Sequence, residues 1–483
     1  MSRRLEFIRR CLVGAIAVVS LGCEDGAPPA PAFEAKLDAA VIEAVTKRDM
    51  PGAALVVVEG DRVTYSKGFG KANLATGEPV TDSTPFVIGS TSKPLAALAV
   101  LRLVQLGKMA LDTPIVRYAP DLAFRDSRAA TMTLRHLLTN RAGLPVGFSG
   151  PAYRRPPIQD SAAVERLARS MAAQPLLFAP GEGYAYSNRG WSLAGYLVQR
   201  VSGRPIEDFM REEVFRPLGM TGTTLEFWKV PNLVQGYAEG RQTRNHPHPA
   251  SLTREYGASG MIVSTPRDMG RLLVAMMNGG RTVEGKQFLT PALIAEALRG
   301  QAEAESELGG PTRYALGWEV DSMLGTTTIK KAGSVHSMVS LWVMLPERRV
   351  GFAFAFNRED YQILPLVGNV AAVIAGGEAA PFPDAARPEA PVPAAAAVAR
   401  SRLAGWVGTY DTRFGEVTVY LRGDSLWTDY DGSEVALVPA NDSSFALVDD
   451  LVSNAGKTMT FGRRQGTVLM TVSGDSVGAR RSP

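Results

Sequence analysis

The sequence predicts an α+β fold followed by a small all-β domain. Apolar β-type segments occur near both ends of the first 376 residues, and a long, mainly helical stretch separates them. Short alternating segments recur after a stretch rich in proline and alanine. Helices that are segregated from the strands in this way are typical of the α+β class, in which a sheet built from both ends of a domain brackets a helical insert.

The first element is an export signal over residues 1–22. Basic residues precede an apolar run that ends at Gly22 and is too short to cross a bilayer as a stable helix. Ser20-Leu21-Gly22-Cys23 is similar to a bacterial lipobox, in which a small residue precedes the lipidated cysteine. We expect Cys23 to anchor an exported protein at the bacterial cell envelope, in the periplasm. Signal cleavage that yields a soluble secreted protein is the alternative.

A tether over residues 23–33 leads into the main domain, which we place at 34–376. Its two ends contain a predicted helix at 35–47, strands at 53–58, 63–68, 326–331, 338–345 and 350–356, and a helix at 361–375. Glu59-Gly60-Asp61 and Pro346-Glu347-Arg348 are turn sequences, and each predicts a hairpin between the strands beside it. The stretch between these ends is mainly helical up to about residue 300.

Two segments follow the main domain. Residues 377–401 are rich in proline and alanine without an apolar period, which predicts a semi-extended linker. Residues 402–476 contain short segments of alternating polarity separated by turn sequences such as Asp431-Gly432. This pattern predicts a small, barrel-like all-β domain.

Composition limits the classes of partner and cofactor. The 483 residues carry a formal net charge of +4, and the export signal supplies most of it, so we expect no nucleic-acid partner. Both cysteines, Cys11 and Cys23, lie in the N-terminal segment, which excludes a disulfide or a cysteine-based metal site in the mature domains. We expect no metal and no cofactor, and contact with a membrane only through the lipid anchor.

The first motif with catalytic potential is a serine followed by a lysine three residues later. In Ser90-Thr91-Ser92-Lys93 the two side chains share a face if a helix starts at Ser90, and Gly107 is placed to end that helix. An amine beside a hydroxyl can accept its proton and make it a nucleophile. Lys93 is a candidate acceptor if burial and neighbouring charge lower its pKa. The bland alternative is that Ser90 is only a helix N-cap.

Two further short motifs follow in the chain. Tyr186-Ser187-Asn188 gives Y-x-N before a helical pattern, and Lys331-Ala332-Gly333 gives K-x-G at the end of a predicted strand. Each motif is weak alone, but their order and their element types make the set informative. The alternatives are packing and turn roles for Tyr186 and Asn188, and a solvated strand position for Lys331.

Each of these residues has a chemical use in acyl transfer. Tyr186 can relay a proton to the leaving group, and Asn188 can bind a substrate amide or hold the lysine of the first motif in place. Lys331 supplies positive charge for an oxyanion or a substrate carboxylate, and Gly333 allows the strand backbone to approach the substrate. The N–H groups of Ser90 and Ser334 are the natural oxyanion-hole pair.

These residues resemble the serine β-lactamase and penicillin-binding-protein superfamily, on its class C side, which also holds family VIII esterases and D-aminopeptidases. The segments that carry the resemblance, besides the three motifs, are Thr133 to Thr139 with Gly143-Leu144-Pro145, Tyr186 to Gly190, and Gly260 to Met269. The likeness covers about residues 35 to 375.

The resemblance implies a β-lactamase/transpeptidase-like fold, an antiparallel sheet flanked by helices with an all-helical subdomain. It implies a serine hydrolase that forms an acyl-serine on Ser90 and uses Lys93 and Tyr186 as the acid/base pair, on an ester or a peptide-like amide. Ala332 stands where the family often has a hydroxyl that binds a β-lactam carboxylate, which argues against an efficient β-lactamase. β-Lactamase or D,D-peptidase activity is the alternative, and a non-catalytic binder of cell-wall or peptide ligands is the second.

The four histidines carry weaker signals. His336 follows the third motif, and we expect it to have a structural or substrate-rim role. His246 and His248 flank a proline in a loop, and two histidines at i and i+2 without further ligands are poor grounds for a zinc site.

Overall fold

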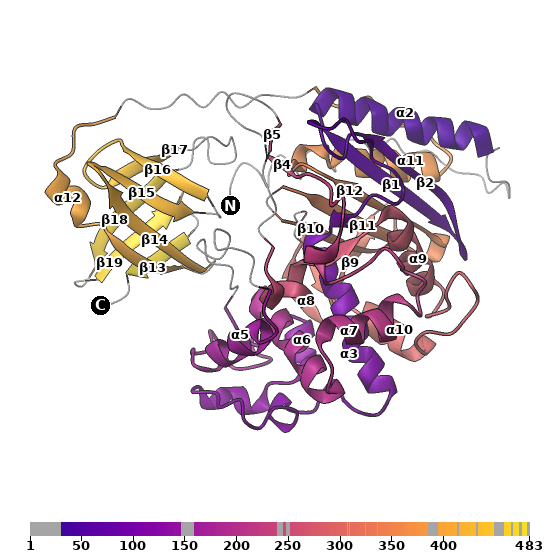
Figure 1. The fold of residues 1–483 in the computed structure, drawn as a ribbon, viewed down its shortest axis with the longest axis horizontal. Coiled ribbons are helices and arrows are strands. Elements are labelled where there is room, and N and C mark those ends of the chain that lie inside the picture. The colour runs from indigo at the N-terminus through magenta and orange to yellow at the C-terminus, as the bar shows by residue number, and fades with distance from the viewer. Residues whose placement is uncertain are drawn as a thin grey trace.

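The computed structural model describes residues 30–145, 159–238, 245–247, 252–306, 308, 310–323, 325–335, 337–384, 395–412, 415–430, 433–448, 458–464, 467–472 and 476–480. They form a main domain of sheet and helices and, to one side of it, a barrel (Figure 1). The predicted α+β class with an appended barrel-like domain is confirmed. The predicted export signal, Cys23 and most of the tether lie outside the described residues.

An eight-stranded sheet, in the order β2-β1-β12-β11-β10-β9-β8-β7, forms the centre of the main domain. Its strands are β1 (Gly52–Glu59), β2 (Arg62–Gly70), β7 (Ala302–Glu305), β8 (Pro311–Tyr314), β9 (Glu319–Met323), β10 (Thr326–Ser334), β11 (Val339–Leu345) and β12 (Val350–Phe356). β1 pairs with β12 so that Ala53 lies opposite Phe356 and Glu59 opposite Val350. Strands from the two ends of the domain are therefore neighbours, as the sequence predicted.

β1 and β11 lie inside the sheet and read as continuous apolar runs because both of their faces are buried. On one face, helices α2 (Ala30–Arg48) and α11 (Pro365–Ile374) pack side by side (Figure 1). The second of these helices begins later than predicted, since residues Tyr361–Ile363 form a 3₁₀ turn and proline is favoured in the first helical turn.

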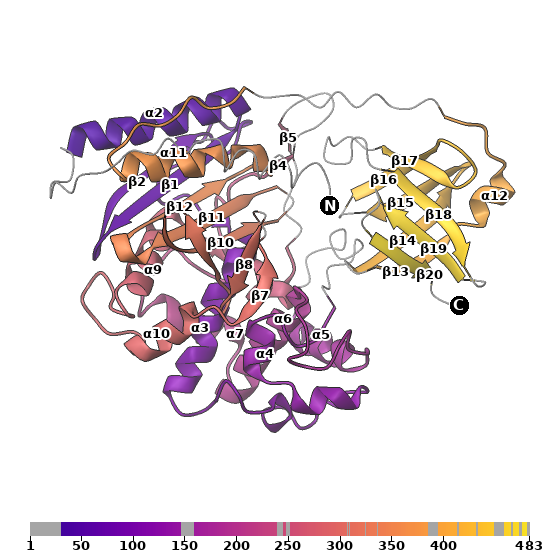
Figure 2. The ribbon, with the colours of Figure 1, turned by 180° about the vertical axis from the view of Figure 1, so that it is seen from behind.

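The other face of the sheet carries the helical part of the domain (Figure 2). Its helices are α3 (Ser92–Gln105), α4 (Leu134–Leu138), α5 (Ala163–Ala172), α6 (Asn188–Ser202), α7 (Ile206–Met210), α8 (Gly257–Gly260), α9 (Pro266–Met277) and α10 (Pro291–Leu298). Two short strand pairs complete the described part, β3 (Phe86–Val87) with β6 (Val263–Ser264) and β4 (Tyr237–Ala238) with β5 (His246–Pro247). α3 is a central helix, because nearly all of it is buried, and Gly107 follows it at a φ of +68°.

The strands β7, β8 and β9 were not predicted from the sequence. Their segments, Ala-Glu-Ala-Glu, Pro-Thr-Arg-Tyr and Glu-Val-Asp-Ser-Met, are short and contain charged residues. They end the sheet in the order β9-β8-β7, and β7 is its edge strand, where one side faces solvent and polar residues are tolerated. The sheet is thus wider than expected by three strands.

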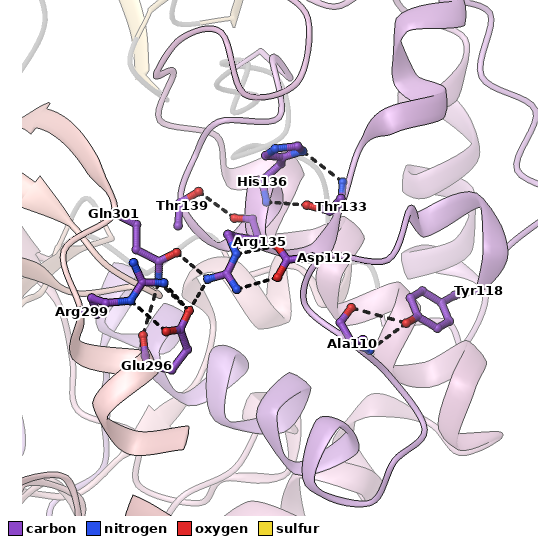
Figure 3. A network of polar contacts seen from close by, with 10 residues as sticks. All are labelled: Ala110, Asp112, Tyr118, Thr133, Arg135, His136, Thr139, Glu296, Arg299 and Gln301. Carbon is purple, nitrogen blue, oxygen red and sulfur yellow. Dashed lines mark hydrogen bonds and ion pairs between the residues drawn. The ribbon is translucent and has the colours of Figure 1, made fainter. Parts of the chain in front are cut away.

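A network of charged groups ties the helical part to this edge of the sheet (Figure 3). The guanidinium of Arg135, on α4, donates to both carboxylate oxygens of Asp112 at 2.6 and 2.8 Å and to Oε1 of Gln301 at 2.6 Å. It also pairs with Glu296 of α10. The hydrogen bond from Arg135 holds the pKa of Asp112 below its usual range. Arg135 therefore joins three segments that are distant in the sequence.

Part of the predicted linker lies against the main domain. Phe382 is buried in the core beneath α2 and α11, and Lys47 Nζ donates to its carbonyl at 2.5 Å. Asn369 Nδ2 donates to the carbonyl of Ala380 at 2.7 Å. Because these contacts bury side chains and satisfy backbone groups, residues 377–384 continue the main domain.

The C-terminal residues form a closed antiparallel barrel of eight strands that follow one another in order. They are β13 (Gly408–Thr412), β14 (Gly415–Arg422), β15 (Ser425–Tyr430), β16 (Ser433–Pro439), β17 (Ser444–Val448), β18 (Thr458–Arg464), β19 (Thr467–Val472) and β20 (Ser476–Arg480), preceded by helix α12 (Arg400–Ala404). β13 and β20 close the barrel, where Tyr410 pairs with Arg480. Closure leaves no free sheet edge, which is how small antiparallel domains avoid edge pairing.

None of the helices in the described ranges combines the length and the apolar character that a membrane-spanning helix requires.

Candidate active site

Ser90 lies in a 3₁₀ turn, Gly89–Thr91, immediately before α3. The expectation that a helix starts at Ser90 is therefore corrected by two residues, because the α-helix begins at Ser92. The tighter turn still places Ser90 and Lys93 on one side, since residues three apart eclipse each other in a 3₁₀ helix. Ser90 is half-buried, whereas Lys93 is fully buried.

Buried hydroxyl groups hold this turn against the sheet. Thr91 Oγ1 donates to the carbonyl of Ile88 at 2.6 Å and lies 2.7 Å from Ser340 Oγ of β11. Ser340 Oγ donates to the same carbonyl at 2.7 Å. Such buried, satisfied polar groups fix local geometry because breaking one leaves a desolvated partner. The nucleophile candidate thus stands on a rigid base.

Two glycines allow the turn and strand β10 to meet backbone to backbone. Gly89 has a φ of +55°, and a Cβ added there would lie 2.5 Å from the backbone nitrogen of Ser334. A Cβ added to Gly333 would lie 2.7 Å from the backbone nitrogen of Ser90. Contacts this short exclude a side chain at either position. The two N–H groups expected to form an oxyanion hole therefore belong to backbone segments in direct contact.

Lys93 Nζ meets three oxygens. It donates to Ser90 Oγ at 3.0 Å, to Asn188 Oδ1 at 2.7 Å and to the carbonyl of Ser259 at 2.7 Å. A carbonyl and an amide oxygen can only accept, whereas the Ser90 hydroxyl can accept or donate. With a neutral amine, the lone pair would thus face Ser90. Ser259 belongs to α8 and was not identified from the sequence, because its contribution is a backbone atom.

Tyr186 approaches Ser90 from the other side. Its hydroxyl donates to Ser90 Oγ at 2.6 Å, and its ring lies 4.7 Å from Lys93 Nζ and 5.2 Å from Lys331 Nζ. The structure therefore brings together Ser90, Lys93, Tyr186 and Lys331, which come from three distant parts of the sequence. A cation over an aromatic ring is attracted to its face, so the two lysines also help to orient the phenol.

The segment that carries Tyr186 and Asn188 is positioned by Asn140. Asn140 Oδ1 accepts from the backbone of Ser187 at 3.3 Å and from Trp191 Nε1 at 3.1 Å, and its carbonyl accepts from Ala185 at 2.9 Å. Asn140 is buried and has a φ of +57°, which asparagine tolerates better than most residues. The sequence offered no period or motif that would have indicated this role.

The loop that leads to Tyr186 packs on His136. A Cβ added at Gly181 would lie 3.2 Å from His136 Nε2, and His136 Nδ1 accepts from the backbone of Thr133 at 3.2 Å. Burial, followed by the neighbouring charge of Arg141, lowers the pKa of His136 from its ordinary value of 6.5. His136 therefore belongs to the support of the site, as part of the capping box of α4.

Lys331 has a buried carboxylate partner that the sequence did not reveal. Its Nζ lies 3.7 Å from Glu319 Oε1, and both side chains are almost fully buried. Ser306 Oγ also donates to Glu319, and the ring of Tyr314 lies 5.6 Å from Lys331 Nζ. Glu319 begins β9, one of the strands that the sequence did not predict, so the pair could not be foreseen. The positive charge of Lys331 is balanced inside the protein.

The end of β10 carries the remaining candidates. Ser334 is half-buried, and its hydroxyl donates to Glu359 Oε1 at 2.8 Å. Ala332 is buried in the core on the α2 and α11 side of the sheet. Because Ala332 packs in that core, its missing hydroxyl is a weaker argument against β-lactams than the sequence suggested.

His336, His248 and residues 146–158 lie outside the described residues. In the ranges that the structure covers, no three or more His, Cys, Asp or Glu side chains gather in a group that could hold a metal ion.

Comparison with known proteins gives one family. Residues 37–365 match the family model described as Beta-lactamase, which is well over half of the chain. Esterase EstB of Burkholderia gladioli is 35% identical over 201 residues, covering 40% of this chain and 51% of EstB. Putative penicillin-binding protein PbpX of Bacillus subtilis is 31% identical over 231 residues, covering 47% of this chain and 55% of PbpX. The chain thus spans about half the length of these two relatives.

A Beta-lactamase of Yersinia enterocolitica is 29% identical over 350 residues, covering 65% of this chain and 83% of that protein. Among solved structures, the octameric penicillin-binding protein homologue from Pyrococcus abyssi superposes with a TM-score of 0.62 at 22% identity and covers 92% of this chain and 100% of that chain. SurE superposes with a TM-score of 0.61 at 24% identity and covers 93% of this chain and 100% of its own. At these identities the structural likeness shows the fold alone.

Proposed function

Because this chain belongs to the Beta-lactamase family, we propose that it is a serine hydrolase that acts through an acyl-serine on an ester or a peptide-like amide. The observation that carries the proposal is the convergence on Ser90 Oγ of Lys93 Nζ at 3.0 Å and the Tyr186 hydroxyl at 2.6 Å. A serine between two groups that can exchange protons is the arrangement that nucleophilic catalysis requires.

The proposed reaction has two halves. Ser90 Oγ attacks the substrate carbonyl while its proton passes to Lys93, and the negative oxygen that forms is bound by the N–H groups of Ser90 and Ser334. The leaving group takes a proton through Tyr186 and departs, which leaves the acyl-serine. Water then attacks the acyl carbon, loses a proton to the same pair, and releases the acid and free Ser90. Asn188 holds Lys93 through the hydrogen bond at 2.7 Å and is available to a substrate amide.

Labelling separates this enzyme from a protein that only binds ligands. We expect a fluorophosphonate probe to form a covalent adduct on Ser90 that mass spectrometry locates, and Ser90→Ala to form none. p-Nitrophenyl esters, D-amino-acid amides and nitrocefin would then rank the substrates. A folded protein that forms no adduct with the probe or with a fluorescent penicillin, and turns over none of these substrates, would favour a non-catalytic binder of cell-wall or peptide ligands.

β-Lactamase or D,D-peptidase activity is the second candidate. The relatives named Beta-lactamase and putative penicillin-binding protein favour it, as does the presence of Lys331 at the third motif. We rank ester hydrolysis above these activities because EstB, an esterase, is 35% identical over the region that it matches. Turnover of nitrocefin that exceeds turnover of every ester would reverse this order.

We also propose that the protein is exported and held at the bacterial cell envelope by a lipid on Cys23. The lipobox-like Ser20-Leu21-Gly22-Cys23 supports this proposal. In a bacterial host, we expect the full chain to fractionate with membranes and Cys23→Ser to appear in the soluble fraction. Equal membrane association of both forms would contradict the lipid anchor.

A further inference from the structure

Glu359 places a carboxylate at the end of strand β10, beside the proposed oxyanion hole. It lies three residues after β12, is half-buried, and accepts from Ser334 Oγ at 2.8 Å. No lysine or arginine of the described ranges forms an ion pair with it. Neighbouring Arg358 and Asp360 are buried and bonded to each other, Nη2 to Oδ2, at 3.0 Å. The loop that carries Glu359 is therefore fixed.

Its position follows from the contacts of Ser334. The backbone nitrogen of Ser334 would lie 2.5 Å from a Cβ at Gly89, the residue before Ser90. The Glu359 carboxylate thus accepts a hydrogen bond from the side chain of Ser334, the residue whose backbone N–H would stabilise the oxyanion. A carboxylate so close to the oxyanion opposes the negative charge that develops in the transition state, unless a cation sits beside it.

The lysine of the third motif does not supply that cation. Lys331 Nζ lies 3.7 Å from Glu319 Oε1, with both groups buried, so its charge is already balanced. Lys93 Nζ is directed to Ser90, Asn188 and the Ser259 carbonyl. Within the residues that the structure describes, neither lysine complements Glu359, so a cationic substrate would supply that charge.

We propose that Glu359 is a specificity-determining residue that selects substrates carrying an ammonium group near the scissile carbonyl and disfavours substrates that carry a carboxylate there. This inference rests on the proposed hydrolase function. It gives that function a substrate class, cationic esters or amides, and places anionic acyl donors, β-lactams included, at a disadvantage.

Three p-nitrophenyl esters of similar length test the inference: one of trimethylammonio-butyric acid, one of valeric acid and the mono-ester of glutaric acid. The quantity measured is the ratio of kcat/KM for the cationic ester to kcat/KM for the anionic ester. We expect the purified full chain to favour the cationic ester, and Glu359→Gln to lower the ratio by about tenfold. Glutamine keeps an acceptor for Ser334, so the hydrogen bond is retained and the charge alone is removed. Glu359→Lys should invert the preference.

Asp61→Asn is the matched control. It removes one negative charge from the exposed turn between β1 and β2, and β1 pairs with β12 so that this turn lies at the opposite end of the sheet from Glu359. Its ratio should equal that of the parent. Raising the salt concentration should lower the ratio of the parent more than that of Glu359→Gln, because exposed charges are screened.

The outcomes are distinct. An unchanged ratio in Glu359→Gln, or an equal loss for all three esters, would overturn the specificity role and leave the hydrolase intact. A folded parent that hydrolyses none of the esters and is not labelled at Ser90 would instead overturn the proposed function. Where a variant has a melting temperature below that of the parent, the ratio is still informative, because partial unfolding lowers both rates equally.

Discussion

The two buried lysines of the site show how surroundings divide one residue type between two tasks. Lys93 and Lys331 are both fully buried and both lie over the ring of Tyr186, at 4.7 and 5.2 Å. Lys93 meets neutral oxygens at 2.7 to 3.0 Å, whereas Lys331 faces the carboxylate of Glu319 at 3.7 Å. Lys93 thus contacts the candidate nucleophile directly, whereas Lys331 is paired with a buried carboxylate. We propose on this basis that Lys93 transfers the proton and that Lys331 supplies a fixed charge.

The largest expected effect tests whether Lys93 takes part in acylation. Lys93→Ala should lower the rate of acylation of Ser90 by about 10³-fold or more, because it removes the group that accepts the proton. Stopped-flow release of p-nitrophenol measures this rate. Lys108→Ala is the control, since Lys108 is an exposed lysine just after the same helix. Equal rates in Lys93→Ala and the parent would remove lysine from the mechanism.

The second prediction tests the buried ion pair between Lys331 and Glu319. Glu319→Gln leaves Lys331 buried without a carboxylate and should lower the free energy of unfolding by about 3–5 kcal/mol, as measured by urea denaturation. Replacing both partners by apolar residues, Lys331→Met with Glu319→Leu, should recover most of that stability. Lys330→Ala is the matched control, because its pair with Asp321 is closer to solvent and should cost about 1 kcal/mol.

A loss of stability in Lys330→Ala as large as that in Glu319→Gln would mean that burial of the Lys331 pair is unimportant. Failure of the double variant to regain stability would mean that Glu319 acts mainly through its other contacts, such as the hydrogen bond from Ser306. Both results would weaken the distinction between a proton carrier and a fixed charge.

The third prediction tests the position of the Tyr186 phenol, whose ring lies beside both lysines. Asn140→Gly removes the acceptor for Ser187 and Trp191 and should cost about 1–3 kcal/mol of stability. Asn140→Ala should cost about 1 kcal/mol more, because alanine is strained at a φ of +57°. In both variants kcat for a neutral ester should fall as the segment of Tyr186 shifts. Wild-type kcat in a folded Asn140→Gly protein would show that the segment of Tyr186 keeps its position without Asn140.

Parts of this site could be predicted from the sequence and parts could not, for physical reasons. Ser90, Lys93, Tyr186 and Lys331 stand in short patterns whose order along the chain indicated one site, and the structure brings them together. Glu319 could not be found in this way, because strand pairing places Glu319 opposite Lys330 and no pattern of residues encodes that pairing. Ser259 acts through a carbonyl, which every residue has.

The fold shows the same division. β1, β11 and β12 are apolar because they are buried on both faces, and such runs are conspicuous in a sequence. β7, β8 and β9 are short strands with charged residues at one end of the sheet, and their pairing is fixed by neighbours rather than by composition. The Ser90 turn is 3₁₀ rather than α because Gly89 and Gly333 bring two backbones into contact, which is a tertiary effect.

The smallest expected effect concerns pH and the support beneath Tyr186. Burial lowers the pKa of His136 in the folded state from an ordinary 6.5, so the unfolded chain binds a proton more readily. His136 therefore contributes stability that is fully present above pH 6.5 and is lost as the pH falls below it. His136→Gln keeps an acceptor for the backbone of Thr133 and removes the titration, so its free energy of unfolding should fall less between pH 7.5 and about 5. Because the ring is partly exposed, solvent screening limits the difference to less than about 1 kcal/mol. Identical pH dependence in urea titrations of the two proteins would assign the acid sensitivity of the domain to its carboxylates, Asp112 beside Arg135 among them.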